Sequence, residues 1–322
     1  MINSSKLKKY IIAIFFSLTF VYSNAPLKAD IKVVTTIQPL HSLVANVMDG
    51  TGDLGLILEG SASPHNFSLK PSHAKMLEKA DVVFWFGEDL EIFLEKALKT
   101  IPTKAKIISF MKLKEIPKLK FREKNIFEHD DHKDEHKDEH KDGHDEHKDE
   151  HDHAHGEFDV HLWLDPINAK IIVKEIAHVL SDVDPSNAKK YNNNANKTLL
   201  KLDRMVLDIK KSINKRARFI TFHDAYQYFE KRFEVASMGA LTVNTDVQPG
   251  AKQISEIRKH VKEENIKCIF SEPQFNPKII KVIAESTNIK TGVFDPLGSS
   301  FKPGKSLYFS LINDLSKNLS GC

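Results

Sequence analysis

The stretch RFITFHDAYQYFEKRFEVAS, residues 218–237, decides the fold class. RFITF at 218–222 is an apolar run with β-branched and aromatic residues, which predicts a buried strand. A helix is predicted from Ala225 to Arg232, and FEVAS at 233–237 is predicted as the next strand. A strand, a helix and another strand in such close succession are typical of a parallel sheet covered by helices.

The same alternation extends in both directions along the chain. On the C-terminal side, helices are predicted at 251–264, 277–286 and 305–319, and strands are predicted between them at 266–270 and 289–294. On the N-terminal side, strands are predicted at 31–37, 54–58, 81–86 and 105–110. The helices between them are predicted at 40–48, 72–79 and 90–98. We therefore expect an α/β protein with two similar lobes, each a mainly parallel four-stranded sheet flanked by helices.

Two helices are predicted between these halves, at 167–180 and 185–216. The second would be about 45 Å long, which exceeds what one small lobe needs and favours a rigid connector between lobes. The alternative is a long helix lying along one domain. The expected organisation is a lobe at 30–184, which includes an unusual segment at 128–156, then the connecting helix at 185–216 and a lobe at 217–322.

The first 29 residues have the pattern of a secretory signal peptide. Lys6, Lys8 and Lys9 precede the apolar run Tyr10–Tyr22, which small residues follow. The run is shorter than the ~20 residues that span a bilayer, so a permanent membrane anchor is the weaker alternative. No cysteine near the expected cleavage region could accept a lipid, so we expect a protein that is exported and not lipid-anchored. The cleavage point stays open.

Charge indicates no nucleic-acid partner. The formal net charge is +3, and it falls to about −1 when the lysines of the expected signal peptide are removed. Residues 129–155 hold 12 acidic residues and 4 lysines, and so carry −8, while the rest of the mature chain is basic. The two parts would attract each other.

Cys268 and Cys322 are the only cysteines of the chain. In an oxidising compartment, such a pair favours a disulfide over two free thiols, which remain the alternative. The bridge would close a loop of about 55 residues, contribute on the order of 4 kcal/mol by the chain-entropy account, and staple the C-terminal helix.

Potential metal ligands follow three predicted strands. His65 comes after the second strand, His223 after the strand at 218–222, and Asp295 after the last strand. Ligands of open α/β sheets bind at the carboxyl ends of strands, so these three positions favour one common site. His161, where the acidic segment ends and a helix begins, is the fourth candidate.

Three imidazoles and one carboxylate would fill a tetrahedral zinc shell and leave no position for a substrate. If water completes the shell instead, a zinc hydrolase remains an alternative from another class of protein. Asp165 before Pro166 is explained as a helix N-cap, so we do not count it as a ligand. The other single histidines fall at helix starts or inside helices, where packing or solvent exposure explains them: His41, His73, His178 and His260.

The segment at 128–156 repeats a unit that resembles HKDE and has almost no apolar residue to bury. We expect a mobile surface loop. Nine histidines lie in it: His129, His132, His136, His140, His144, His147, His151, His153 and His155. Imidazoles among carboxylates bind divalent metals, so the loop could collect zinc for the main site, sense surplus metal, or be a solvated insertion without an essential role.

Five motifs carry a resemblance to a known family. SPHNFSLKPS, HLWLDP, FHDAYQYF, SEPQF and FDPLG occur in this order, and together they resemble the zinc-binding solute receptors of bacterial ABC importers. The resemblance runs from about residue 31 to the C-terminus. It also covers the His-rich acidic insertion, and it implies the Cys268–Cys322 disulfide of Gram-negative members.

The resemblance implies that the metal ligands are His65, His161 and His223, with Asp295 at the position of a carboxylate ligand. Manganese relatives tend to have a carboxylate where this chain has His223, and imidazole favours zinc over manganese. Some zinc receptors have a glutamate where this chain has Pro64, so the fourth ligand is Asp295 or water. The long helix of the family joins the lobes, with the metal in the cleft between them, and limits them to small movements.

We therefore expect a monomeric, non-enzymatic protein in the periplasm of a Gram-negative bacterium. It would capture Zn²⁺ as the transported ligand and deliver it to the importer's permease and, through it, to the cytoplasmic ATPase. A zinc storage or buffering protein and a manganese receptor are the alternatives, with a surface adhesin or a nickel- or copper-binding protein behind them.

Overall fold

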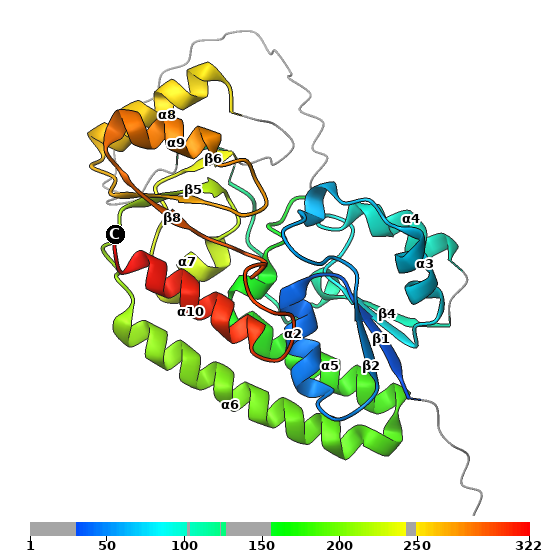
Figure 1. Ribbon diagram of the computed structural model, residues 1–322. Coiled ribbons are helices and arrows are strands. Elements are labelled where there is room, and N and C mark those ends of the chain that lie inside the picture. Colours follow the sequence, from blue (N-terminus) through cyan, green and yellow to red (C-terminus); the bar gives the residue numbers. More distant parts are fainter. Residues whose placement is uncertain (1–29, 102–103, 123, 127–155, 243–248) are drawn as a thin grey trace, which may run out of the picture. The chain divides into compact units, whose positions relative to one another are not determined.

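The computed structural model describes residues 30–101, 104–122, 124–126, 156–242 and 249–322. The expected signal peptide and the nine histidines between His129 and His155 lie outside these ranges. The described chain contains two four-stranded sheets in which every pairing of neighbouring strands is parallel, as the alternation of strands and helices predicts (Figure 1).

The first sheet has the strand order β2-β1-β3-β4. Its strands are β1 (Lys32–Thr35), β2 (Asp53–Leu56), β3 (Val82–Trp85) and β4 (Lys106–Ser109). Val33 of β1 lies opposite Leu54 on one side and Val82 on the other. β3 is buried along its whole length, because it is an inner strand with helices on both faces.

Alternate residues of this sheet point into two different apolar clusters. Val33 joins the cluster that contains Leu40, and Val34 joins the one that contains Leu77 and Leu94. The helices that supply these leucines are α2 (Gln38–Val47), α3 (Pro71–Glu78) and α4 (Ile92–Thr100). The two-residue period of the strands therefore places α2 on one face of the sheet and α3 and α4 on the other (Figure 1).

The second sheet repeats the topology of the first, with the order β6-β5-β7-β8. Its elements are β5 (Phe219–His223), α7 (Gln227–Phe233), β6 (Ala240–Thr242), α8 (Ala251–Glu263), β7 (Cys268–Ser271), α9 (Lys278–Thr287), β8 (Lys290–Val293) and α10 (Leu307–Leu319). Phe219 packs into the cluster with α7 and α10, and Ile220 packs into the one with α8 and α9.

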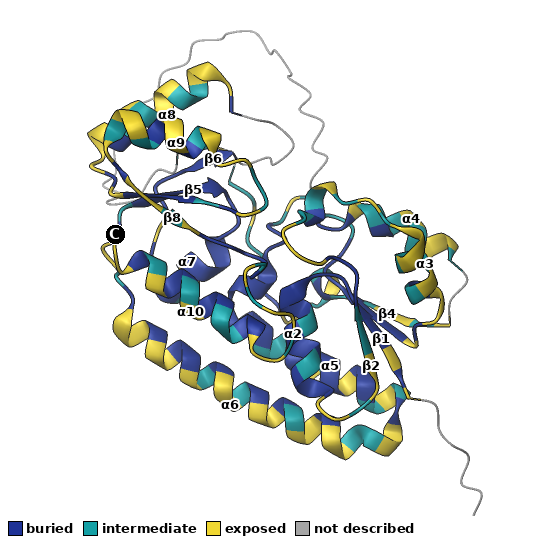
Figure 2. Ribbon diagram, in the orientation of Figure 1, coloured by how far each residue is buried: buried dark blue, intermediate teal, exposed yellow. Residues whose placement is uncertain are grey.

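Two helices come between β4 and β5 in the sequence: α5 (Pro166–Val183) and α6 (Ala188–Ser212). A 3-10 turn at Pro185–Asn187 separates them. α6 has 25 residues, which corresponds to about 38 Å. It packs against α5, α2 and α10, so it joins the two halves and contacts helices from both. Its inward side is buried and its outward side is exposed (Figure 2).

One strand prediction is wrong. The segment at 233–237 is not a strand: α7 continues to Phe233, and Glu234 then adopts a left-handed conformation with φ 56°. The strand begins later, at Ala240. Phe233 and Val235 are both buried, so their apolar character suits a helix end and a turn as well as a strand.

The predicted disulfide between Cys268 and Cys322 is confirmed. It links β7 to the end of the chain after α10, and so staples the last helix to the second sheet. Among the described residues, no helix is both long and apolar enough to cross a membrane. The described residues from Ile31 to Cys322 form a single compact unit, and the domain boundaries expected at 184/185 and 216/217 remain predictions.

Candidate metal centre

His223 is the last residue of β5 and is 5% exposed. Its ring Nδ1 lies 2.8 Å from Oε1 and 2.7 Å from Oε2 of Glu272, and its backbone N–H donates to the same carboxylate at 3.2 Å. Glu272 directly follows β7, the strand beside β5, so the two carboxyl ends meet at one edge of the sheet. The buried carboxylate fixes the orientation of the ring and leaves Nε2 to face away from it.

His161 is held in the same way by a different carboxylate. It precedes a short 3-10 helix at Leu162–Leu164, and its Nδ1 lies 2.6 Å from Oδ1 of Asp159. The same oxygen accepts from the His161 backbone N–H at 2.9 Å. Burial raises the pKa of Asp159 to about 7, although the hydrogen bond from His161 and the nearby positive groups oppose this shift.

His65 lies on a 3-10 turn, Pro64–Asn66, in the loop after β2. Its ring is half-buried, and its backbone N–H donates to Oγ of Ser63 at 3.3 Å. The ring centroid lies 5.7 Å from that of His161 and 6.0 Å from that of His223. The turn therefore places this side chain, from the first half of the chain, against a histidine of the second sheet.

The three histidines form a compact group. One nitrogen from each ring lies within 4.8 Å of the others, and Nε2 of His161 is 3.4 Å from Nε2 of His223. They line a hollow of about 10 Å³, together with Glu272 and Gln274, which is room for roughly one water-sized species. Within the described part of the chain, this is the only group of at least three potential metal ligands.

Asp295 does not belong to this group. It is 5% exposed, and both of its oxygens are occupied by hydrogen bonds. Oδ1 accepts from Nε2 of Gln274 at 2.9 Å, and Oδ2 accepts from Oγ of Ser299 at 2.8 Å. Backbone N–H groups of residues 297 and 300 add two longer contacts, at 3.2 Å and 3.3 Å.

A family described as "ZnuA: Zinc-uptake complex component A periplasmic" matches residues 33–322. The chain belongs to this family. The resemblance seen in the five motifs is thereby confirmed. Membership of a transport family makes the chain a non-enzymatic binding component and removes the hydrolase alternative.

Individual relatives agree with this family. The high-affinity zinc uptake system protein ZnuA of Brucella abortus (strain 2308) is 46% identical over 303 residues, which cover 90% of this chain and 91% of the relative. The protein of the same name from Yersinia pestis is 34% identical over 297 residues, with 91% and 92% covered.

Solved structures give the same fold at lower sequence identity. A crystal structure of ZnuA superposes with a TM-score of 0.72 at 20% identity and covers 91% of this chain and 99% of that chain. A zinc-bound ZnuA mutant that lacks residues 138–173 of its own chain superposes with a TM-score of 0.72 at 20% identity, covering 90% and 97%. At these identities the superpositions establish the fold alone.

Two further expectations concern Asp165 and the single histidines outside the three-histidine group. Asp165 caps α5, since its Oδ1 accepts from the Ile167 N–H at 2.7 Å, and Arg232 also binds both of its carboxylate oxygens. His41, His73, His178 and His260 are not part of the three-histidine group. The N-cap prediction for Asp165 is confirmed.

Sequence reasoning missed the two carboxylates that orient the ligands. Glu272 is in the SEPQF motif, one residue beyond a strand end, and Asp159 comes two residues before His161. Both are fully enclosed, at 2% and 0% exposure. A search for acidic residues at strand ends or beside candidate histidines would have found them, but not which ring nitrogen each one contacts.

A buried ion cluster lies behind the site. Arg122 donates to Oδ1 of Asp224 at 2.8 Å and to Oε2 of Glu230 at 2.6 Å. Burial raises the pKa of Asp224 to about 8, even though the charge of Arg122 acts in the opposite direction. Arg122 thus ties its own segment both to Asp224, which directly follows His223, and to Glu230 of α7.

Proposed function

We propose that this chain captures one Zn²⁺ ion with His65, His161 and His223 and delivers it to the permease of a zinc importer. Its family is a periplasmic zinc-uptake component, and relatives with high identity are named for high-affinity zinc uptake. The three-histidine group supplies a place for the ion, between the first half of the chain and the second sheet.

The separation of the ring nitrogens is the observation that carries this proposal. Two ligands of a tetrahedral zinc ion with Zn–N bonds of 2.0–2.1 Å lie about 3.3 Å apart. Nε2 of His161 and Nε2 of His223 are 3.4 Å apart. Two neutral imidazoles gain little from such an approach, whereas a cation between them makes use of both lone pairs. The side chains are thus arranged in advance for the ion.

The donor set supports zinc rather than manganese. Three imidazole nitrogens suit a borderline ion, whereas manganese prefers oxygen ligands. Copper would bind the same nitrogens more tightly in a test tube, so the supply of metal in the compartment decides which ion is carried.

We propose that water completes the shell in the present arrangement of side chains. Asp295 could take the fourth position only by giving up its hydrogen bonds with Gln274 and Ser299. Such a rearrangement would remove partners from a buried carboxylate, which is unfavourable unless the ion fully compensates for it. Asp295 therefore serves as a support for Gln274, which lines the hollow.

We further propose that the protein acts as a monomer in the periplasm of a Gram-negative bacterium, without a lipid anchor, and that its partner permease is coupled to a cytoplasmic ATPase. The Cys268–Cys322 disulfide supports an oxidising compartment outside the cytoplasm. The expected signal peptide at 1–29, with no cysteine to accept a lipid, supports export of a free protein. The nine histidines of 129–155 would collect metal weakly and pass it to this site.

Release would begin at His65. This residue is half-buried on a short turn, whereas the other two rings are enclosed and held by carboxylates. A small displacement of the turn by the permease would remove one ligand without breaking the contacts of Asp159 or Glu272. The ion would then be held by two imidazoles and would exchange faster.

Competition calorimetry with zinc tests the proposal. The purified protein is compared with a variant that lacks residues 129–155, with His223→Ala, and with His178→Ala as a matched control, because His178 is an exposed histidine on α5. One tight site should survive the deletion and the control, and it should be lost in His223→Ala. Tight binding that disappears with residues 129–155 and persists in His223→Ala would contradict the proposal and favour a buffering role.

A further inference from the structure

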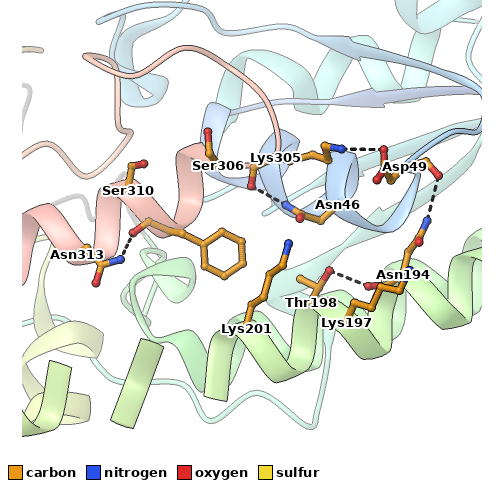
Figure 3. Close-up of a pocket in the computed structure, with 11 residues that line it drawn as sticks. Asn46, Asp49, Asn194, Lys197, Thr198, Lys201, Lys305, Ser306, Ser310 and Asn313 are labelled. Atoms are coloured by element: carbon orange, nitrogen blue, oxygen red, sulfur yellow. Dashed lines mark hydrogen bonds and ion pairs between the residues drawn. The ribbon is translucent and has the colours of Figure 1, made fainter. Parts of the chain in front are cut away.

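A second hollow lies where α2, α6 and α10 meet (Figure 3). Its volume is about 510 Å³, and it shares no lining residue with the three-histidine hollow. One wall is a face of α6 that includes Lys197 and Lys201, and the opposite wall includes Lys305 and Phe309 at the start of α10. These segments are more than a hundred residues apart in the sequence, so only the folded chain creates the hollow.

Positive charge dominates this hollow. Three lysines line it, and Asp49 is the only carboxylate among the described residues that do. Lys305 binds Asp49 at 2.9 Å, which leaves the charges of Lys197 and Lys201 in excess. The hydrogen bond from Lys305 holds the pKa of Asp49 below its ordinary value, and the charges of Lys190 and Lys197 add to this effect. Figure 3 shows Lys201 extending from α6 toward the wall with Asn46 and Lys305.

The walls of the hollow are fixed by side-chain amides. Nδ2 of Asn46 donates to the backbone oxygens of Ser42 at 2.8 Å and Lys305 at 2.7 Å, which ties α2 to the start of α10. Nδ2 of Asn194 donates to the backbone oxygens of residues 47 and 49 at 3.0 Å and 3.1 Å, which ties α6 to the end of α2. The backbone segments that carry the lysines are therefore held in place before a ligand binds, so these walls need not be ordered on binding.

We propose that this hollow binds a small polycarboxylate. Its volume lies within the range of small-molecule sites, which is about 300–1,000 Å³, and greatly exceeds that of a single tetrahedral oxyanion. The ammonium groups of Lys197 and Lys201, one turn apart on α6, match two carboxylates at separate positions of one molecule, since each lysine acts as a point charge. The ring of Phe309 offers an apolar surface to the carbon skeleton, and the hydroxyls of Ser306 and Ser310 can donate further hydrogen bonds.

Calorimetric titration of the metal-free protein with tricarballylate at low ionic strength tests this site. Tricarballylate has three carboxylates and lacks the hydroxyl through which citrate chelates zinc. We expect saturable binding of one molecule, and affinities about fivefold lower in Lys201→Gln and in Lys197→Gln, the effect of one partly exposed ion pair. Lys211→Gln removes the same charge from an exposed position of α6 outside the hollow, and it should change the affinity less than twofold.

Acetate and inorganic phosphate complete the test. Both should bind more weakly than tricarballylate, because neither carries two separate carboxylates that could contact Lys197 and Lys201 at the same time. Equal losses of tricarballylate affinity in Lys201→Gln and Lys211→Gln would overturn the proposal, since they would show that binding depends on the net charge of the protein and not on this hollow. Phosphate that binds more tightly than tricarballylate would overturn the assignment to polycarboxylates, and so would the absence of any saturable binding. Zinc binding by each variant, measured separately, should stay unchanged, so failure of this site is distinct from failure of the zinc site.

Discussion

The two histidines His161 and His223 are built differently from His65. The first two are 3% and 5% exposed, and each rests its Nδ1 on a buried carboxylate. His65 is half-buried on a 3-10 turn, where its backbone N–H donates to Oγ of Ser63 at 3.3 Å. Two ligands therefore form a fixed platform in the interior, and the third closes over it from a loop.

This difference suggests a division of labour between affinity and exchange. Outer-shell carboxylates hold imidazole rings in place and raise their basicity, which strengthens metal binding. A ligand on a short surface turn is easier to displace, so it suits capture and release. The protein would thus combine tight retention at His161 and His223 with a removable third ligand.

The largest expected effect separates the two kinds of ligand directly. His223→Ala should weaken zinc binding by more than about hundredfold, beyond the range of outer-shell changes. It removes a ligand and also leaves the buried carboxylate of Glu272 without its partner. The factor by which zinc affinity falls should be about tenfold smaller in His65→Ala than in His223→Ala. Most of the fall in His65→Ala should come from a faster dissociation rate. Competition with a fluorescent chelator gives the affinities, and stopped-flow chelation gives the rates.

Equal losses in the two variants would show that the buried and the half-buried histidines hold zinc equally well, and a larger loss in His65→Ala would make His65 the principal ligand. Thermal unfolding without metal is the control for folding. His65→Ala should leave the melting temperature nearly unchanged, because the side chain is only half-buried.

The second effect concerns the carboxylate behind the platform. Glu272→Gln should lower zinc affinity by about 10- to 100-fold, the range found for outer-shell partners. The amide keeps the size of the side chain but has no charge to raise the basicity of the ring. Asp165→Asn is a suitable comparison, because Asp165 is also a buried carboxylate but caps α5 and binds Arg232. It should leave zinc affinity within about threefold of the wild type, although it lowers stability.

The third effect is the pH dependence of zinc affinity. Burial lowers the pKa of His223, but the charge and hydrogen bond of Glu272, together with the charges of Asp224 and Asp159, outweigh it, so the pKa is raised above its ordinary value. A protonated imidazole cannot bind zinc, so affinity falls as the pH decreases, and the fall begins above pH 6.5. Between pH 7.5 and 5.5 we expect at least a tenfold loss of zinc affinity. Each proton that competes with zinc for an imidazole lowers the affinity about tenfold per pH unit below the pKa of that imidazole.

Glu272→Gln sharpens this prediction. Without the charge of Glu272, the pKa of His223 loses the largest influence that raises it, while burial still lowers it, so the fall in affinity should begin at a lower pH in this variant. An unchanged onset would contradict the role of Glu272 as the group that raises the pKa. Calorimetry in buffers with different ionisation enthalpies measures the protons released at each pH.

The smallest effect is expected at Asp295. Asp295→Asn keeps a side-chain oxygen that can accept from Gln274 or Ser299, and in our account it removes no ligand. Zinc affinity should therefore fall by less than about tenfold, below the usual range for oriented outer-shell groups. A loss beyond about hundredfold would identify Asp295 as the fourth ligand and require Gln274 to move away. Ser299→Ala, which removes one hydrogen bond to the carboxylate, is the matched control.

Much of the fold follows from patterns in the sequence. Apolar runs such as DVVFWF at 81–86 mark strands that are buried on both faces, and helices could be placed between them from composition and length. The strand after α7 could not be placed, because Phe233 and Val235 are buried in a helix end and a turn. Burial was predicted correctly there, but burial alone does not distinguish a strand from a turn.

The site was predictable in part for a similar physical reason. His65 and His223 follow strands, and strand ends of an α/β sheet converge, so their proximity could be inferred. Asp295 follows a strand too, but its contacts with Gln274 and Ser299 depend on side-chain directions that a sequence does not specify. Glu272 and Asp159 were overlooked because a carboxylate becomes an orienting partner only when a particular ring nitrogen points toward it.

A crystal structure of the zinc-loaded protein, with anomalous diffraction recorded on both sides of the zinc absorption edge, tests the three-histidine site most directly. We expect one strong peak about 2.0–2.1 Å from a ring nitrogen of each of His65, His161 and His223, with water as the fourth ligand. A principal peak away from these three rings, with His161 and His223 still in contact with Asp159 and Glu272, would contradict it.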